Sequence, residues 1–522
     1  MDTLATARRA GRNTVGDALG RAAERHRDRV ALRFGDRAWT FRELDQAAER
    51  AAGQLRAAGL RRGDRVVAYG RNSALYLIAW LGCTKAGVIH VPANYALTAH
   101  ELRYVVEQCG ASLVLHDPAL ASTARDAAGE AVRVVSFTEA LAAPVEGGEV
   151  GADVAGGDVA QILYTSGTTG APKGAALTHD ALLSEYASCT VELEYSARDR
   201  ALAALPLYHT AQMHCFTMPQ LLVGAETVLI ESPAPETCLA LIERHRLTSF
   251  FAPPTVWISL LRYPEFATRD LSSLRNIYYG AAIMPAPVLQ ELRRRLPQAR
   301  PFNCYGQSEI APLATVLRPE EHDARPSSVG RPVLNVRTRV VDPDMRDVTP
   351  GERGEIVHRS PHLMLGYWDK PEETRQAFEG GWFHSGDIGT MDADGYITVV
   401  DRVKDVINTG GVLVASREVE DALFTHPALS EVAVIAVPHP RWVEAVAAVV
   451  VLREGGAATE EELIAHARGQ LAAFKVPKQV FFADSLPKNT AGKLLKRELR
   501  RRYAGTAAAV MGGAAVAGAT DA

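Results

Sequence analysis

The sequence predicts an α/β protein made of a large N-terminal domain and a small, mobile C-terminal α+β domain. Two observations support this prediction. Short apolar, β-branched runs alternate with helical stretches of ten or more residues, which is typical of helices layered on a mainly parallel sheet. The chain also has 522 residues, which exceeds the length of one ordinary domain. We expect layered α/β subdomains and a β-rich lobe in the N-terminal part.

The first elements follow from local signals. Thr40 and Glu43 form a capping box, and apolar residues then recur at helical spacing until Gly59. The predicted strands that follow cover residues 64–69, 88–91, 159–164, 227–229, 249–252 and 276–279, and an apolar helix covers 75–86.

The pattern of predicted elements changes between residues 329 and 400, where short strands are separated by turns. The segment 392–395 imitates the start of a calcium-binding loop but lacks the remaining ligands, so a hairpin turn is predicted there. Helices at 416–424 and 461–471 and strands at 432–437 and 446–451 follow. We therefore predict an N-terminal domain over residues 1–400, a C-terminal domain over 401–503, and a disordered Ala/Gly-rich tail over 504–522.

Composition excludes several classes of protein. The net charge of −4 provides no positive field for nucleic acid. The chain contains no secretory signal and no apolar run that would span a bilayer, so we expect a cytoplasmic protein without an integral membrane segment. Six cysteines are scattered singly, which predicts reduced, structural thiols.

The most specific segment is YTSGTTGAPKG, at residues 164–174, between a predicted strand and a helix predicted to start near Thr178. Its glycines let backbone N–H groups approach an anion, its hydroxyls add donors, and Lys173 adds a positive charge. These groups suit a polyphosphate. The segment is not a Walker loop, because Pro172 precedes the lysine and Gly174 follows it.

Two other chemistries are disfavoured. His209 and His214 have no glutamate between them in the metalloprotease pattern, and neither Ser166 nor Ser308 lies in a Gly-x-Ser-x-Gly elbow.

Residues 164–174 resemble the signature of the adenylate-forming, or AMP-binding, superfamily, which holds acyl-CoA synthetases, beetle luciferases and peptide-synthetase adenylation domains. Further motifs occur in the family's order, so the resemblance covers nearly the whole chain: YGQSE (305–309), GEI (354–356), GYW (366–368), SGD (385–387), DRVKD (401–405) and PKNTAGK (487–493). The resemblance implies a ligase that uses ATP, Mg²⁺ and coenzyme A. Such an enzyme converts a carboxylic acid and ATP into an acyl adenylate and pyrophosphate, then transfers the acyl group to coenzyme A and releases AMP.

The resemblance also implies roles for single residues. Glu309 is similar to the family's magnesium ligand, and Ser308 stands where the family has a threonine that contacts the α-phosphate. Asp387 resembles the carboxylate that accepts from the ribose hydroxyls, and Arg402 the cation that binds ribose or phosphate. Lys493 resembles the lysine that bridges the substrate carboxylate and the α-phosphate. Cations are needed because an anion attacks a phosphate.

The remaining nucleotide and acid positions follow in the same way. His209 matches a position that gates the acyl pocket, and we count it with Lys493, Thr165 and Glu309 as catalytic. The residues implied in nucleotide binding are Thr165, Ser166, Gly167, Thr168, Thr169, Gly170, Lys173, Gly280, Ala281, Ala282, Asn303, Tyr305, Gly306 and Ser308, with Asp387 and Arg402.

The motifs specify the thiol acceptor less closely than they specify the nucleotide. Relatives commonly have Asn where this chain has Leu413 and Gly where it has Val443. A ligase that loads an acyl carrier protein therefore stays open beside coenzyme A, as does an inactive nucleotide-binding homologue. The residues implied in coenzyme A binding are Gly410, Gly411, Trp442, Phe474 and Lys475.

The predicted acyl pocket is mostly apolar and has no Lys or Arg to pair a second carboxylate. This favours a monocarboxylic acid with an apolar body, fatty more than aryl. Asp401 is expected to be the pivot on which the C-terminal domain turns between the two half-reactions. The pocket candidates are His209, Thr210, Gln212, Met213, Thr255, Trp257, Tyr279, Gly280 and Gly306. A solvated helix face is predicted for Lys496, Arg497, Arg500, Arg501 and Arg502.

Overall fold

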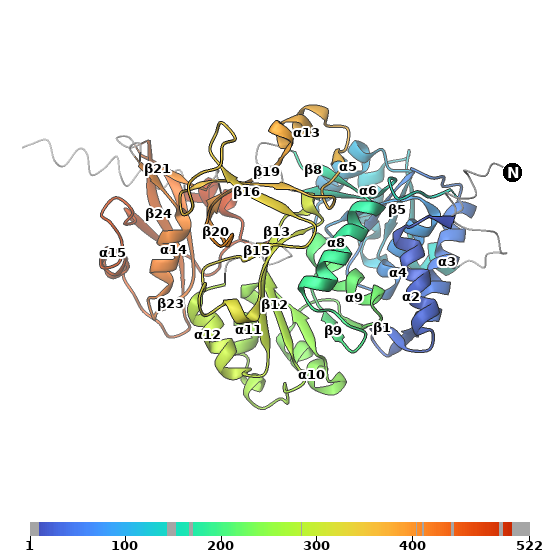
Figure 1. Cartoon of the computed structure of the whole chain (residues 1–522), viewed down its shortest axis with the longest axis horizontal. Coiled ribbons are helices and arrows are strands. Elements are labelled where there is room, and N and C mark those ends of the chain that lie inside the picture. Colours follow the sequence, from blue (N-terminus) through green and yellow to red (C-terminus); the bar gives the residue numbers. More distant parts are fainter. Residues whose placement is uncertain are drawn as a thin grey trace, which may run out of the picture. The chain divides into compact units, whose positions relative to one another are not determined.

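The computed structural model describes residues 10–142, 153–165, 171–282, 284–402, 405–409, 412–439, 443–489 and 494–503, without the side chains of Ala142, Arg402, Val412, Leu413 and Val443. The chain divides into two compact units. Unit 1 comprises Met1–Thr338 and Val357–His384, and unit 2 comprises Arg339–Ile356 and Ser385–Ala522. Helices and mainly parallel sheets alternate in unit 1, so the predicted α/β class is confirmed (Figure 1).

A seven-stranded sheet in unit 1 has the order β18-β8-β7-β4-β3-β5-β6. Its central strands are parallel, whereas β8 runs antiparallel to both β7 and β18. Strands β4 and β5 are buried along their whole length, as expected for a parallel sheet covered on both faces. The strands are β3 (Arg65–Tyr69), β4 (Ile89–Ala93), β5 (Leu113–His116), β6 (Arg133–Ser136), β7 (Val159–Thr165), β8 (Lys173–Thr178) and β18 (Gly366–Tyr367).

A second sheet of unit 1 has nine strands in the order β15-β14-β13-β12-β11-β9-β10-β1-β2. It is parallel from β13 through β1, and β14, β15 and β2 are antiparallel additions at its edges. The strands are β1 (Val30–Phe34), β2 (Arg37–Thr40), β9 (Arg200–Ala203), β10 (Glu226–Leu229), β11 (Ser249–Phe251), β12 (Asn276–Gly280), β13 (Arg300–Gly306), β14 (Leu313–Leu317) and β15 (Arg331–Pro332).

The first helices of unit 1 form one core with both sheets, because Leu32 of β1 and Val66 of β3 belong to the same buried cluster as α2, α3 and α4. All residues of helix α4 except Leu75 and Lys85 are buried, as expected for a helix within a core. The capping box predicted at Thr40 opens α3, as expected. The helices of unit 1 are α2 (Val15–His26), α3 (Phe41–Ala57), α4 (Ala74–Ala86), α5 (Ala99–Cys109), α6 (Ala121–Ala128), α7 (Phe137–Ala142), α8 (His179–Glu192), α9 (Met218–Leu222), α10 (Pro235–His245), α11 (Pro254–Arg262), α12 (Ala286–Arg295) and α13 (Pro371–Ala377).

Short helical turns connect these elements and position several motif residues. The segment η2 is a π-helix, a rare form that is frequent at functional sites. The turns are η1 (Pro118–Leu120), η2 (Ala211–Thr217), η3 (Pro264–Ala267), η4 (Ser308–Ile310), η5 (Pro319–Glu321) and η6 (Glu379–Gly381).

The β-rich segment predicted between residues 329 and 400 forms a four-stranded sheet in the order β16-β17-β19-β20. The hairpin predicted at residues 392–395 joins β19 to β20. Its Asp392 Oδ1 accepts hydrogen bonds from the backbone N–H groups of Asp394 (3.0 Å) and Tyr396 (2.9 Å). The strands are β16 (Arg337–Val341), β17 (Gly354–Arg359), β19 (Phe383–Met391) and β20 (Ile397–Arg402).

The C-terminal part of unit 2 contains a five-stranded sheet, ordered β22-β21-β24-β23 with β25 beside β24. Helices α14 and α15 cover one face, and Leu486, Leu499 and Tyr503 pack on the other. The elements are β21 (Ile407–Thr409), β22 (Val412–Val414), α14 (Ser416–Phe424), β23 (Leu429–His439), β24 (Val443–Leu452), α15 (Glu460–Arg468) and β25 (Gln479–Phe482).

The basic helix at the end of the described chain corrects one prediction. Lys496 Nζ lies 2.7 Å from Glu420 Oε1 and donates to Ser416 Oγ at 2.6 Å, and Arg500 pairs with Asp405. These two side chains therefore join the last helix to α14 and to the segment after β20. The charge run by itself had predicted a solvated face.

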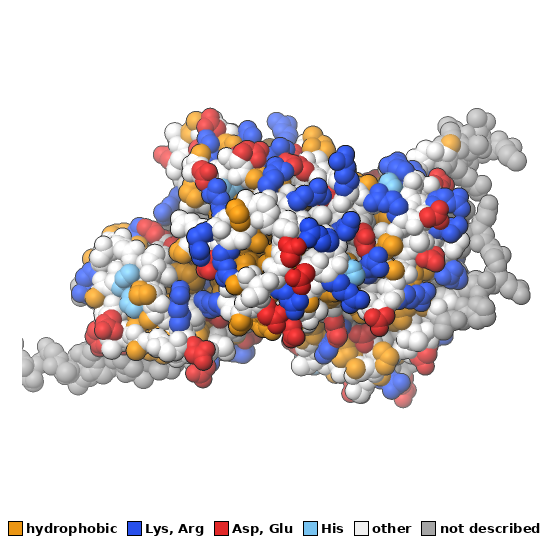
Figure 2. Space-filling view, turned by 90° about the horizontal axis from the view of Figure 1, so that it is seen from below, with side chains coloured by type: hydrophobic (Ala, Val, Ile, Leu, Met, Phe, Trp, Pro, Cys, Tyr) orange, Lys and Arg blue, Asp and Glu red, His pale blue; other side chains and the backbone are white. Residues whose placement is uncertain are grey.

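Figure 2 shows basic, acidic and apolar side chains interspersed on the face seen from below. All six cysteines are free and buried. None of the helices in the described ranges combines the length and the apolar character that a membrane crossing requires.

Candidate active site

The phosphate-loop segment connects two adjacent antiparallel strands. Thr165 at the end of β7 is paired with Lys173 at the start of β8, so the loop lies between these residues. The helix predicted to start near Thr178 is confirmed as α8, whose N-cap is Thr178. The strand β8, which had not been predicted, lies between the loop and this helix. The predicted nucleotide-binding residues Ser166, Gly167, Thr168, Thr169 and Gly170 lie outside the described residues.

Glu309 lies at the centre of the described part of the site. It follows β13 in the short turn η4, and only 9% of its surface is exposed. Its Oε1 atom accepts hydrogen bonds from Thr165 Oγ1 (3.1 Å) and from the phenol of Tyr367 (3.1 Å). Its backbone carbonyl accepts from the N–H group of Met364 (2.8 Å). Three motifs that are far apart in the sequence therefore meet at one carboxylate.

Tyr367 is a member of this site that had not been assigned a role. The only signal in the sequence was its place in the GYW motif. Burial and the charge of Glu309 raise the pKa of Tyr367, so the phenol is protonated and donates. The Nζ atom of Lys173 lies 5.1 Å from the centroid of the Tyr367 ring, a cation–π distance. Two hydrogen bonds are thus directed to Oε1, whereas no described residue donates to Oε2 of Glu309.

Ser308 connects this site to the segment that carries His209. The Oγ1 atom of buried Thr210 donates to Ser308 Oγ at 2.7 Å. His209 is half-buried, and its Nδ1 accepts from the N–H group of Ala211 (3.3 Å) at the start of the π-helix. The structure therefore brings the predicted acyl-gate segment beside the residue that precedes Glu309.

The predicted nucleotide-binding residues 280–282 and 303–306 lie toward the carboxyl ends of two neighbouring parallel strands, β12 and β13. Gly280 ends β12 and is paired with Cys304 of β13. A Cβ atom at Gly280 would lie 2.2 Å from the Cys304 carbonyl oxygen, so only glycine fits there. Ala281 follows with a φ of +61°, and both Ala281 and Ala282 are exposed. Ligands of α/β sheets bind at such strand ends.

The predicted nucleotide-binding residues of β13 also make contacts within the protein. The Asn303 side chain donates to the Ser328 carbonyl (3.0 Å), which fixes the following loop. The phenol of Tyr305 accepts from Gln307 Nε2 (3.2 Å). At Gly306 a Cβ atom would lie 1.8 Å from the Pro312 carbonyl oxygen, so this close approach also requires glycine.

In unit 2, Asp387 lies directly opposite Arg402 on the antiparallel strands β19 and β20. Asp387 is 3% exposed, and its backbone N–H donates to Ser385 Oγ (3.0 Å). Directly opposed cross-strand residues are neighbours, so the two predicted ribose-binding residues are brought together. Asp401 is buried, and its Oδ2 accepts from the N–H group of Ser416 (2.5 Å), the first residue of α14.

Lys493, Gly410, Gly411 and Trp442 lie outside the described residues. Phe474 is 43% exposed. Lys475 is paired with Glu418 on α14, so its charge is already partly matched within the unit.

Known proteins match this chain over most of its length. The family model described as AMP-binding enzyme matches residues 19–368, and that described as AMP-binding enzyme C-terminal domain matches residues 418–493. The feruloyl-CoA synthase of an Amycolatopsis species is 41% identical over 91% of this chain and 96% of its own. The long-chain-fatty-acid–CoA ligase of Bacillus subtilis is 32% identical over 93% of this chain and 94% of its own.

A solved structure is similar over the same extent. The o-succinylbenzoate CoA synthetase of Bacillus subtilis, in complex with its acyl-adenylate intermediate, has a TM-score of 0.85 and 30% identity. The match covers 92% of this chain and 97% of that one.

Proposed function

Because the chain belongs to the family of AMP-binding enzymes, and within it to the acid–CoA ligases, we propose that its acid substrate is aromatic. The family and the enzyme class predicted from the motifs are confirmed, and enzymes of this class use a carboxylic acid, ATP and coenzyme A. For the proposed site, the observation that carries the argument is the convergence of Thr165 and Tyr367 on the Glu309 carboxylate.

The proposed reaction has two steps. In the first, the substrate carboxylate attacks the α-phosphorus of ATP, the bond from this phosphorus to the bridging oxygen breaks, and pyrophosphate leaves. In the second, the sulfur of coenzyme A attacks the acyl carbon, AMP leaves with its phosphate oxygen, and the thiol proton passes to solvent. The first step brings two anions together, so it depends on preorganised positive charge and hydrogen-bond donors.

Glu309 suits a divalent cation. Mg²⁺ prefers carboxylate and phosphate oxygens, and Oε2 of Glu309 receives no hydrogen bond from the described residues. We propose that this oxygen holds Mg²⁺, which would offset the negative charge of the phosphates. Thr165 and Tyr367 orient the carboxylate through its other oxygen. Lys173, which lies over the Tyr367 ring, adds positive charge to the same site.

The choice of an aromatic acid departs from the fatty acid favoured by the pocket composition. The identity of 41% to a feruloyl-CoA synthase, against 32% to a long-chain-fatty-acid–CoA ligase, supports it, because the feruloyl group is aromatic. Several pocket candidates are also fixed by contacts of their own. Trp257 donates to the Tyr278 carbonyl (3.3 Å), and the phenol of Tyr279 lies 2.9 Å from His322 Nε2. Such fixed walls suit a rigid, planar acid.

Gln212 is a poor candidate for recognition of the acid. Its Oε1 accepts from the N–H group of Leu205 (3.2 Å), and its Nε2 donates to Thr217 Oγ1 (3.0 Å). Its amide thus holds the π-helix to the end of β9. His209 and Thr210, beside Ser308, are better placed, and we propose that they border the reacting carboxylate.

For the second unit we propose the roles that the family motifs imply. Asp387 and Arg402 bind the ribose, Lys493 bridges the two reactants, and Gly410, Gly411 and Trp442 border coenzyme A. The proximity of Asp387 to Arg402 supports the first of these assignments. We also propose that the mobile domain begins near Asp401.

A pyrophosphate-exchange screen tests the acid. The enzyme is incubated with ATP, Mg²⁺, labelled pyrophosphate and one acid at a time: ferulate, benzoate, indole-3-acetate, octanoate or palmitate. We expect exchange with ferulate to exceed exchange with either fatty acid, and mass spectrometry to detect feruloyl-CoA after coenzyme A is added. Preference for a fatty acid would contradict the aromatic assignment. Acylation of a phosphopantetheinylated carrier protein, with coenzyme A ignored, would contradict the acceptor.

A further inference from the structure

We propose that Glu185, a buried residue of α8 without an assigned role, is a positioning residue that holds Glu309 and Tyr367 in their catalytic arrangement. This inference rests on the proposed role of Glu309. The Glu185 side chain is 0% exposed. Its Oε1 accepts a hydrogen bond from the N–H group of Leu313 (3.0 Å), and its Oε2 lies 3.0 Å from His362 Nδ1.

The two partners of Glu185 belong to the two segments that meet at Glu309. Leu313 begins β14, the strand that directly follows the loop of Glu309. His362 lies in the segment that leads through Met364 to Tyr367, and both of these residues bond Glu309, through its carbonyl and its carboxylate respectively. One buried carboxylate thus accepts a hydrogen bond from the segment after Glu309 and lies within 3.0 Å of the segment that leads to Tyr367.

His362 also contacts a second side chain of α8. Ser188 lies one turn further along α8, and its Oγ is 3.0 Å from His362 Nε2. The same Oγ accepts from the N–H group of Asn335 (3.3 Å). Both ring nitrogens of His362 therefore face side chains of α8, so the ring can neither turn nor shift without the loss of a contact. Helix α8 itself follows β8, the strand that pairs with both β7 and β18.

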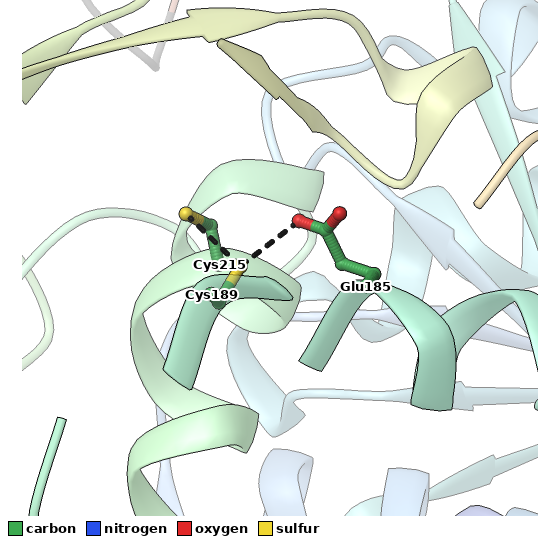
Figure 3. A group of neighbouring side chains, drawn as sticks. All are labelled: Glu185, Cys189 and Cys215. Carbon is green, nitrogen blue, oxygen red and sulfur yellow. Dashed lines mark hydrogen bonds between the residues drawn. The ribbon is translucent and has the colours of Figure 1, made fainter. Parts of the chain in front are cut away.

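Two cysteines complete the surroundings of this carboxylate. Figure 3 shows Glu185 beside Cys189 and Cys215. The Cys189 thiol donates to Glu185 Oε1 (3.1 Å), and the two sulfur atoms lie 3.7 Å apart. Such a group could hold a metal ion only as thiolates. Burial raises the pKa of both thiols, and Oε1 is already engaged by Leu313, so the cysteines act as donor and packing partner of the carboxylate.

A structural role alone would explain the burial of Glu185 but would not link it to Glu309. The test is therefore a double-mutant cycle. Glu185→Gln keeps an acceptor for the Leu313 N–H group and replaces the carboxylate oxygen beside His362 Nδ1 with an amide nitrogen. Pyrophosphate exchange is measured for this variant, for Glu309→Gln and for the double variant, together with the melting temperature and the Mg²⁺ concentration for half-maximal exchange.

We expect Glu185→Gln to lower kcat/KM of exchange about tenfold or more and to raise the Mg²⁺ requirement, since a displaced stabilising group is partly lost. In the Glu309→Gln background the same change should cost less than about threefold, because it acts through Glu309. The matched control is Glu192→Gln, on the same helix. It breaks a pair with Arg318 (2.6 Å), which follows the other end of β14 from Leu313, and it should leave exchange and its Mg²⁺ dependence unchanged.

The inference is overturned if folded Glu185→Gln exchanges as fast as the wild type, or if its loss is equal in both backgrounds. If Glu185→Gln does not fold, Ser188→Ala replaces it in the same cycle. This change removes only one contact of His362, and we expect it to lower kcat/KM of exchange about threefold. The affinity of each variant for MgATP is also measured by calorimetry, which does not depend on turnover. A wild type that binds MgATP but exchanges with no acid would contradict the proposed function, whereas unaltered MgATP affinity in Glu185→Gln would contradict only the role of Glu185.

Discussion

The phenol of Tyr367 donates a hydrogen bond to Oε1 of Glu309 across 3.1 Å, and both side chains are largely withdrawn from solvent. Tyr367 lies on β18 at the edge of the seven-stranded sheet, and Glu309 follows β13 of the nine-stranded sheet. The contact thus joins the two sheets of unit 1 at the site where ATP is proposed to bind.

Glu309→Gln should lower acid-dependent pyrophosphate exchange by about a hundredfold or more, because the amide replaces the charge proposed to hold Mg²⁺. The measurement is exchange at saturating ATP over a range of Mg²⁺ concentrations. Glu320→Gln is the control, since its side chain is 62% exposed and lies in a different turn. Undiminished exchange in Glu309→Gln would remove this residue from the site.

Tyr367→Phe deletes the phenol hydroxyl and keeps the ring beneath Lys173. A hydrogen bond to a charged group contributes about 1.5 to 3 kcal/mol, so we expect exchange to fall by about ten- to a hundredfold with little change in melting temperature. Because burial and Glu309 raise the pKa of Tyr367, the phenol stays protonated from pH 6 to 9 and should add no inflection to the pH profile in that range. An alkaline limb below pH 9 that disappears in Tyr367→Phe would contradict this assignment.

Lys493→Ala should abolish adenylation and spare the second half-reaction. The reason is that a cation is needed when the acid attacks the α-phosphate, but not when a thiol displaces AMP. The two steps are measured separately, as pyrophosphate exchange and as thioester formation from a synthetic acyl adenylate. Lys488→Ala, which removes a lysine paired with Glu431 at 2.6 Å, is the control in the same motif. Equal loss of both steps in Lys493→Ala would argue against the proposed division of labour.

Asp401→Pro should spare adenylation and slow thioester formation, because proline fixes φ at the proposed pivot. The structure adds a control, since Asp401 also accepts a hydrogen bond from the Ser416 N–H group. Asp401→Asn retains an acceptor and a free φ and should support both steps. If Asp401→Asn slows thioester formation as much as Asp401→Pro does, the effect comes from the Asp401 side chain, and this result would contradict its role as a backbone pivot.

Acid should destabilise the fold through buried neutral histidines. Burial lowers the pKa of His90, His214 and His358 to about 3. Between pH 6.5 and 3 the unfolded chain therefore binds protons that the folded chain does not, so the free energy of unfolding falls as the pH falls. The slope approaches about 1.4 kcal/mol per pH unit for each group. His214→Gln should flatten the dependence of the melting temperature on pH below 6, whereas a change at the exposed His100 should not.

The local elements could be predicted from the sequence because they depend on short-range patterns. The capping box at Thr40 needs only residues within one turn, and the apolar spacing of residues 75–86 already defines a buried helix. The family was evident for a similar reason. Each of its motifs is a short segment, and their order along the chain is independent of how the chain folds.

Where local patterns competed with long-range pairing, prediction from the sequence failed. No element was predicted between the phosphate loop and the helix near Thr178, but this short run forms β8, which pairs on one side with β7 and on the other with β18, nearly two hundred residues away in the sequence. The charges of Lys496 and Arg500 indicated solvent exposure, and only the partners Glu420 and Asp405 make them structural.

The sequence by itself determined the α/β class, the family and the identity of the residues that can carry charge or donate hydrogen bonds. Only the tertiary structure decided that Thr165 and Tyr367 bond the same oxygen of Glu309, and that Glu185 contacts both segments behind it. The physical reason is that strand order and register, which no local pattern encodes, bring these side chains to within hydrogen-bonding distance. A glutamate in the middle of a helix looks like a surface residue until the fold surrounds it with Leu313 and His362.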